Sequence, residues 1–255
     1  MKRCGNHAII NWIRAHDEFV FFNNVLPIGR VIDGRMDIPP PMDFRQWLRG
    51  ANFRKIKRTQ DFVKKILFRH CSIIVSMEDH DLQVRLFRNV HYEVTNILLL
   101  RDPYNMLASR IRKASLYNQS LVFPKRFNSL LTRVIQQWKA YAREYLGITS
   151  FLDNKLPIYF NTWFSDERYR RQISRKLGFE FTDKTFSEIN LKHSGGSSFD
   201  TNKYDGRSHE MNVLNRTSQL NAEEKRLLNE LFNDQELNEL ALEIMKRTVT
   251  GIDQY

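Results

Sequence analysis

The chain has 255 residues, of which 42% are hydrophobic and 27% are charged, so its composition excludes a disordered protein and allows a sizeable core. The formal net charge of +11 predicts an anionic partner, which can be a phosphate- or sulfate-bearing ligand or a nucleic acid. Two cysteines are too few for a disulfide framework. No apolar run approaches the roughly 20 residues of a membrane span or forms a signal-peptide core. We therefore expect a cytoplasmic protein that does not cross a membrane.

The first element that we expect is a helix that follows a short basic loop at the start of the chain. Gly5 and Asn6 punctuate the loop, and the apolar spacing from Ala8 to Ile13 predicts the helix. A loop that leads into a helix points backbone N–H groups and the positive end of the helix dipole at one small volume. Because Lys2 and Arg3 add positive charge there, the combination is typical of a phosphate or sulfate site. Its spacing is not that of the Walker A sequence found in Mg-ATP sites.

Two short strands are expected next, with a long basic region between them. Phe19 to Phe22 and Cys71 to Met77 are apolar runs of strand length. Between them, Arg30 to Pro41 has the glycine and prolines of a loop, and Phe44 to Leu67 is partly helical with charges that form a solvated face. The second strand ends in Glu78-Asp79-His80, at the edge where parallel α/β sheets bind their ligands.

A third strand and the helix after it form a second candidate anion site. Ile97 to Leu100 is a continuous apolar run of the buried-strand type, and Arg101 follows it directly. Pro103 suits the first turn of a helix with Asp102 near its cap, and Ser109 lies about two helical turns later. Arg101 and Ser109 can therefore face one ligand group, which we expect to be a second phosphate.

Together the two motifs resemble those of the PAPS-dependent sulfotransferases, whose donor is 3′-phosphoadenosine 5′-phosphosulfate. In that family a loop of the type Pro-Lys/Arg-Ser-Gly-Thr-Thr binds the 5′-phosphosulfate, and a strand ending in Arg, with Ser eight residues later, binds the 3′-phosphate. The first motif is matched here by Lys2-Arg3-Cys4-Gly5-Asn6-His7, with Cys4 in place of Ser and Asn6-His7 in place of the Thr pair. The second is matched at the same spacing by Arg101-Asp102-Pro103 and Ser109. The resemblance implies that the loop, up to the backbone N–H of Ala8, holds the phosphosulfate and that Arg101 and Ser109 select the 3′-phosphate.

The resemblance also implies catalytic roles. Arg3, with help from Lys2, would stabilise the leaving phosphate. A base must take the proton of the acceptor hydroxyl, and the cluster at the strand end offers Glu78, Asp79 and His80, with Glu78 ahead of His80. Asp79 or Asp81 can instead serve as a helix cap. The histidines lack metal-ligand spacing with matching cysteines, so we expect no metal.

The second half of the chain predicts three more helices and one more strand. Apolar residues at helical spacing run from Phe127 to Tyr141, and we expect them, Leu130 included, to lie in the core. Leu156 to Phe160 predicts a fourth strand, and Asp166 to Leu177 a basic helix. A final amphipathic helix is expected from Asn221 to Met245.

The polar stretch from His193 to Ser218 is expected to be a loop, because it is rich in glycine and serine. Sulfotransferases close a flexible basic segment over the donor's 3′-phosphate just before their last helices, but their Arg-Lys-Gly triplet is absent here. The resemblance therefore leaves several donor contacts open in this stretch, namely Ser197, Ser198, Lys203, Arg207 and Arg216.

We expect a single α/β domain over residues 1–255, with three layers (α/β/α), a mainly parallel sheet of four or five strands and P-loop-NTPase-like topology. In that topology a strand precedes the phosphate loop, so we expect the first strand to be truncated here, which would leave neighbouring strands unpaired. The implied function is transfer of a sulfuryl group from PAPS to a hydroxyl or amine of an acceptor, and the positive charge favours a carbohydrate acceptor over a nucleic-acid partner. Two alternatives remain open: a P-loop-like kinase, and a non-catalytic basic protein that binds nucleic acid or sulfated glycans.

Overall fold

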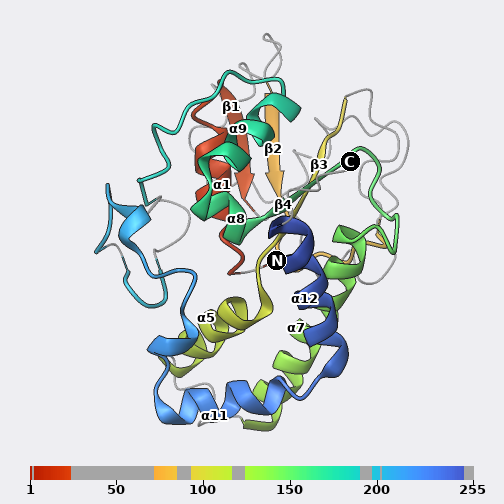
Figure 1. The fold of residues 1–255 in the computed structure, drawn as a ribbon, viewed down its shortest axis with the longest axis vertical. Helices are drawn as coiled ribbons and strands as arrows, with labels where there is room; N and C mark the ends of the chain where they lie inside the picture. The colour runs from red at the N-terminus through yellow and green to blue at the C-terminus, as the bar shows by residue number, and fades with distance from the viewer. Residues whose placement is uncertain are drawn as a thin grey trace, which may run out of the picture.

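The computed structural model describes residues 1, 3–23, 72–84, 93–116, 124–189, 197–201 and 203–249, and the statements below concern these residues. They form a mixed α/β structure in which short parallel strands are surrounded by helices (Figure 1). Lys2 and the predicted loop and helical region between Arg30 and Leu67 lie outside the described residues.

Four strands pair as two parallel sheets of two strands each. β1 (Phe19–Asn23) pairs with β2 (Ser72–Ser76), and β3 (Asn96–Leu100) pairs with β4 (Lys155–Tyr159), each pair in register from end to end. The four predicted strands are therefore confirmed to within a residue at most ends. Within the described chain β2 and β3 are not paired with each other, so a single sheet of four or five strands stays a prediction.

Seven α-helices and two short 3-10 helices occur in the described part of the chain. The α-helices are α1 (Asn6–Ile13), α5 (Pro103–Leu116), α7 (Pro124–Tyr145), α8 (Phe160–Ser165), α9 (Glu167–Lys176), α11 (Ala222–Leu231) and α12 (Gln235–Val249). The 3-10 helices are η2 (Ser208–Glu210) and η3 (Thr217–Gln219).

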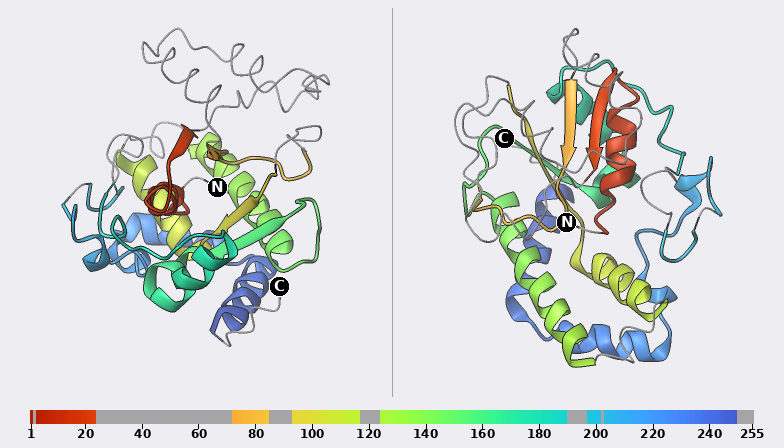
Figure 2. Two further views of the ribbon diagram at one scale, coloured as in Figure 1. Left: turned by 90° about the horizontal axis from the view of Figure 1, so that it is seen from above. Right: turned by 180° about the vertical axis from the view of Figure 1, so that it is seen from behind.

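The helices form two groups around the strands. α1, α8 and α9 lie beside β1 and β2, while α5, α7, α11 and α12 lie at the opposite end of the molecule (Figure 1). α7 packs against both β3 and α12, and α11 packs against α5. Met1 is buried, and the N-terminus lies near the carboxyl ends of β2 and β3 (Figures 1 and 2).

Two predictions about the helices are wrong. Leu130 is 48% exposed, because its neighbour Leu131 occupies the inward face of α7 and successive helical residues point about 100° apart. The final helix is also not continuous. α11 ends before Phe232, and the Asp234 side chain accepts the backbone N–H of Leu237 at 3.0 Å, which starts α12 as a separate helix.

Candidate functional site

The loop before α1 has the backbone geometry of an anion-binding turn. Gly5 has a φ of 84°, and a Cβ built on it would lie 2.1 Å from Cε2 of Phe160, so only glycine fits there. Arg3 also has a positive φ of 66°, which is uncommon for a residue with a side chain. No side chain caps α1, which begins at Asn6, so the positive end of its dipole faces the loop.

Arg101, which directly follows β3, reaches this loop. Its Nη1 donates a hydrogen bond to the backbone oxygen of Arg3 at 3.1 Å, and its Nη2 donates to the backbone oxygen of Val213. Its guanidinium carbon lies 4.9 Å from the centre of the Phe160 ring, the same ring that fills the space beside Gly5. The two motifs that the sequence places almost a hundred residues apart are therefore in direct contact.

Arg101 is a buried cation that its described surroundings do not neutralise. The residue is 5% exposed, and burial lowers the pKa of its guanidinium, although the neighbouring Asp102 charge opposes this. Within the described chain it makes no ion pair, and its Nε has no hydrogen-bond partner. Leaving a charge buried and unpaired costs several kcal/mol, roughly, so this position favours the binding of an anion.

The Asp102 side chain caps the start of α5. Its Oδ1 accepts the backbone N–H of Asn105 at 2.7 Å, and its Oδ2 accepts Nδ2 of Asn161 at 2.8 Å. The predicted cap is thus confirmed. Trp138 donates from its Nε1 to the Arg101 backbone oxygen at 2.8 Å, so the backbone of Arg101 is held in place as well.

A second group of predicted residues gathers around Ser109 of α5. The hydroxyls of Ser109 and Ser198 are hydrogen bonded at 2.8 Å, and Nη2 of Arg216 donates to the Ser197 hydroxyl at 3.3 Å. Arg216 is 2% exposed, and burial lowers its pKa. The segment that carries Arg216 is joined to Arg101, because the Arg101 guanidinium donates to the backbone oxygen of Val213, three residues earlier in the chain. The structure therefore joins Ser109, Ser197, Ser198 and Arg216 in one cluster.

Arg207 is not joined to this cluster by any described contact. Its side chain is 60% exposed, and its Nη1 pairs with Oε2 of Glu210 at 3.1 Å in η2. Arg207 also closes a turn, because its backbone N–H donates to the Tyr204 oxygen at 2.9 Å and Gly206 has a φ of 77°.

The acidic cluster after β2 contacts the start of α1 and the helix α5. Oε1 of Glu78 accepts Nδ2 of Asn6 at 3.0 Å and lies 3.7 Å from Nε2 of His7. Asp79, with a φ of 54°, is paired with Nη2 of Arg110 at 2.7 Å. Of the predicted bases, Glu78 is thus the one that touches the loop.

His80 is turned to a different partner. Its Nε2 lies 3.0 Å from the backbone oxygen of Val84, and since a carbonyl only accepts, this nitrogen carries the proton. Burial lowers the pKa of His80, which favours the neutral ring. Its own backbone oxygen accepts from Gln137 and from the Tyr141 hydroxyl, so the segment after β2 is anchored to α7.

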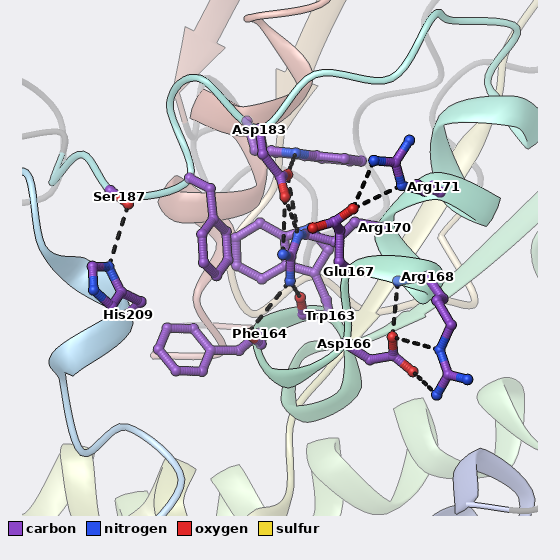
Figure 3. A network of polar contacts seen from close by, with 12 residues as sticks. Trp163, Phe164, Asp166, Glu167, Arg168, Arg170, Arg171, Asp183, Ser187 and His209 are labelled. Atoms are coloured by element: carbon purple, nitrogen blue, oxygen red, sulfur yellow. Dashed lines mark hydrogen bonds and ion pairs between the residues drawn. The ribbon is translucent and has the colours of Figure 1, made fainter.

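A network of polar contacts holds α1 in place. Nε1 of Trp12 donates to Oδ1 of Asp183 at 2.8 Å, and Arg170 pairs with the same carboxylate, with Nη2 2.9 Å from Oδ2. The Arg170 guanidinium also donates to the backbone oxygen of Trp163 at 2.8 Å and stacks on the Phe186 ring (Figure 3). Because Arg170 and Trp12 are buried, these bonds fix the helix whose N-terminus faces the site.

Three residues at the site were missed by sequence reasoning. Asn105 could have been found, since it stands three residues after Asp102, the spacing of a helix cap, and its amide also binds the Leu214 oxygen at 2.9 Å. Phe160 and Asp200 give no local signal, because their roles beside Gly5 and Arg216 depend on contacts between distant segments.

Among the described residues no three His, Cys, Asp or Glu side chains are grouped as a metal site would require. None of the described helices combines the length and apolar character of a membrane span. Comparison of the chain with protein-family models, with curated proteins and with solved structures gave no match.

Proposed function

We propose that this protein binds a nucleotide with two separated anionic groups and acts as a PAPS-dependent sulfotransferase. The observation that carries the proposal is Arg101. Its buried guanidinium has no described ion-pair partner, touches the loop at Arg3 and donates to the backbone oxygen of Val213, three residues before Arg216. A buried arginine in such a position is a strong binding site for phosphate.

The two groups of contacts are assigned to the two ends of the donor. The loop around Gly5 and the uncapped start of α1 would hold the 5′-phosphosulfate, since backbone N–H groups and the helix dipole both favour negative charge. Arg101, Ser109 and Arg216 would hold the 3′-phosphate, the group by which PAPS differs from ATP. This assignment uses the fold with three layers and one parallel sheet that the sequence predicts.

Sulfuryl transfer requires the protein to stabilise the leaving phosphate of the donor and to accept the proton of the acceptor hydroxyl. As the sulfur–oxygen bond to the donor phosphate breaks and the bond to the acceptor oxygen forms, charge accumulates on the leaving phosphate. Arg3 would stabilise that charge, and positioning of both reactants would supply most of the remaining rate.

Glu78 is the base that we propose. Its carboxylate is hydrogen bonded to Asn6 in the loop and is partly accessible, with a side chain 16% exposed. His80 is a poorer choice, because the described contact of its side chain is with the Val84 backbone, whereas Glu78 contacts the loop. The proton of the acceptor hydroxyl would pass to the Glu78 carboxylate as the new sulfur–oxygen bond forms.

Calorimetry with three nucleotides tests the proposal. We expect adenosine 3′,5′-bisphosphate to bind more tightly than adenosine 5′-monophosphate or ATP, and Arg101→Ala to weaken the bisphosphate by about 2–5 kcal/mol. Arg226→Ala, which removes an exposed arginine of α11, is the matched control and should bind as the unaltered protein does. A preference for ATP would instead favour a kinase, and no nucleotide binding would favour a non-catalytic basic protein.

A labelled-PAPS transfer screen over acceptor classes then tests catalysis. If the assignment is right, Arg3→Ala lowers the rate more than it lowers donor affinity, and Glu78→Gln lowers the rate with little change in the binding of the bisphosphate. Equal rates in these variants would remove the two residues from the mechanism.

A further inference from the structure

The segment 197–201 supplies its own anion to the site. Oδ2 of Asp200 lies 2.6 Å from Nη1 of Arg216, whose side chain is only 3% exposed. The contact is a short, charge-assisted one in a poorly solvated place, where such pairs are strongest. Arg216 is thus already neutralised by the protein itself, in contrast to Arg101.

The turn around Asp200 is shaped to hold the carboxylate there. The Ser197 hydroxyl accepts the backbone N–H groups of Phe199 and Asp200, both at 3.1 Å, and donates to the Asp200 carboxylate at 3.2 Å. Ser197 and Thr201 are joined by two backbone hydrogen bonds of 2.9 and 3.0 Å. The Asp200 side chain is therefore tied into a closed turn of five residues.

The same turn also covers Ser109. Ser198 binds the Ser109 hydroxyl, and the Phe199 ring lies between two guanidinium groups, 4.8 Å from that of Arg216 and 5.1 Å from that of Arg112. Ser109 and Arg216, which would together hold a phosphate, are thus occupied by Ser198 and Asp200 of this turn.

We infer that the Asp200 carboxylate competes with the ligand's 3′-phosphate for Arg216 and thereby limits how tightly 3′-phosphorylated nucleotides bind. The inference rests on the function proposed above. A phosphate carries close to two negative charges and three acceptor oxygens, and it can bind an arginine bidentately, so it can replace a single carboxylate. A nucleotide without the 3′-phosphate has no anionic group that can replace Asp200 at Arg216, so the turn stays closed. Asp200 therefore lowers the preference of the site for 3′-phosphorylated nucleotides over nucleotides without that phosphate.

Calorimetry on Asp200→Asn tests the inference. Asparagine keeps an acceptor for Ser197 but loses the charge, so we expect adenosine 3′,5′-bisphosphate to bind about tenfold more tightly, because two like charges no longer meet at Arg216. Binding of adenosine 5′-monophosphate should change less than twofold. Glu188→Gln, which removes one exposed carboxylate elsewhere, is the charge-matched control and should change neither affinity by more than twofold.

The outcomes separate the inference from the proposed function. If the unaltered protein binds the bisphosphate through Arg101 and Asp200→Asn binds it equally or more weakly, the inference is overturned and the proposed function stands. If only Asp200→Asn binds the bisphosphate, the inference is supported in its strongest form. If neither binds it, both fall.

A measurement on the unaltered protein covers the case in which Asp200→Asn does not fold. Hydrogen exchange of the backbone N–H groups of residues 199–201 should become several times faster at saturating bisphosphate, because the turn is released when its carboxylate leaves Arg216. Exchange that is unchanged or slower overturns the inference.

Discussion

Gly5→Ala is the most direct test of the geometry on which the site depends. Two costs are expected. A residue with a Cβ at a φ of 84° loses roughly 1–2 kcal/mol, and the new methyl group, 2.1 Å from the Phe160 ring, adds a packing cost of about 1–3 kcal/mol. The free energy of unfolding should therefore fall by about 2–5 kcal/mol, measured by urea denaturation.

Gly206→Ala is the matched control for this substitution. Gly206 has a φ of 77°, but a Cβ built on it would have no heavy atom within 4 Å, so only the conformational cost of about 1–2 kcal/mol applies. The difference between the two variants isolates the contact with Phe160. A double-mutant cycle with Phe160→Leu should show a favourable coupling of about 1–3 kcal/mol, because the smaller side chain makes room for the methyl group. If Gly5→Ala costs no more than Gly206→Ala, the close approach of loop and ring is wrong.

Two further predictions concern buried charges away from the cluster. Burial pushes the pKa of Glu144 upward, but hydrogen bonds from Lys155 and from nearby backbone N–H groups outweigh it and leave the pKa below its usual value. The stabilisation by the ionised Glu144 carboxylate is thus present above pH about 4.5 and is lost as the pH falls through the lowered pKa. Glu144→Gln should therefore lower the free energy of unfolding by about 3 kcal/mol at pH 7. Urea unfolding of both proteins from pH 7 into acid should show this difference shrinking as the pH falls. Asp183→Asn should leave the buried Arg170 without its carboxylate and lower the free energy of unfolding by about 2–3 kcal/mol. Arg171→Ala removes an exposed arginine of the same helix and should change the free energy of unfolding by less than about 1 kcal/mol. Equal losses in the two variants would mean that the Arg170–Asp183 pair does not hold α1.

The local elements could be predicted from the sequence because each carries its own signal. The apolar runs that form β2 and β3 and the glycine before α1 identify structure within a few residues of themselves. Asp166 and Asn221 likewise cap the helices that the sequence places after them, through bonds to the backbone N–H of Arg168 and Glu224.

The pairing of strands and the partners of charged groups could not be predicted in the same way. Which edge of β2 or β3 is paired depends on segments far apart in the chain, and a period-2 pattern does not specify it. Leu130 shows the same limit on a helix, since its position next to Leu131 does not say which of the two turns inward. Arg207 matched the expected composition of a donor-binding segment, but it is paired with Glu210 at the surface.

Arg101 and Arg216 differ in how their buried charges are compensated by the protein. Both guanidinium groups are buried, and each would repel the other unless anions are present. Asp200 neutralises Arg216, which limits the cost of burying two cations in the absence of a ligand. Arg101 keeps only carbonyl oxygens and an aromatic face as described partners, so it retains attraction for an incoming anion. A nucleotide without a 3′-phosphate would leave both arginines as they are, whereas a 3′-phosphate would bind Arg101 and compete with Asp200 for Arg216, and this difference is what would allow the protein to distinguish a 3′-phosphorylated nucleotide from an ordinary one.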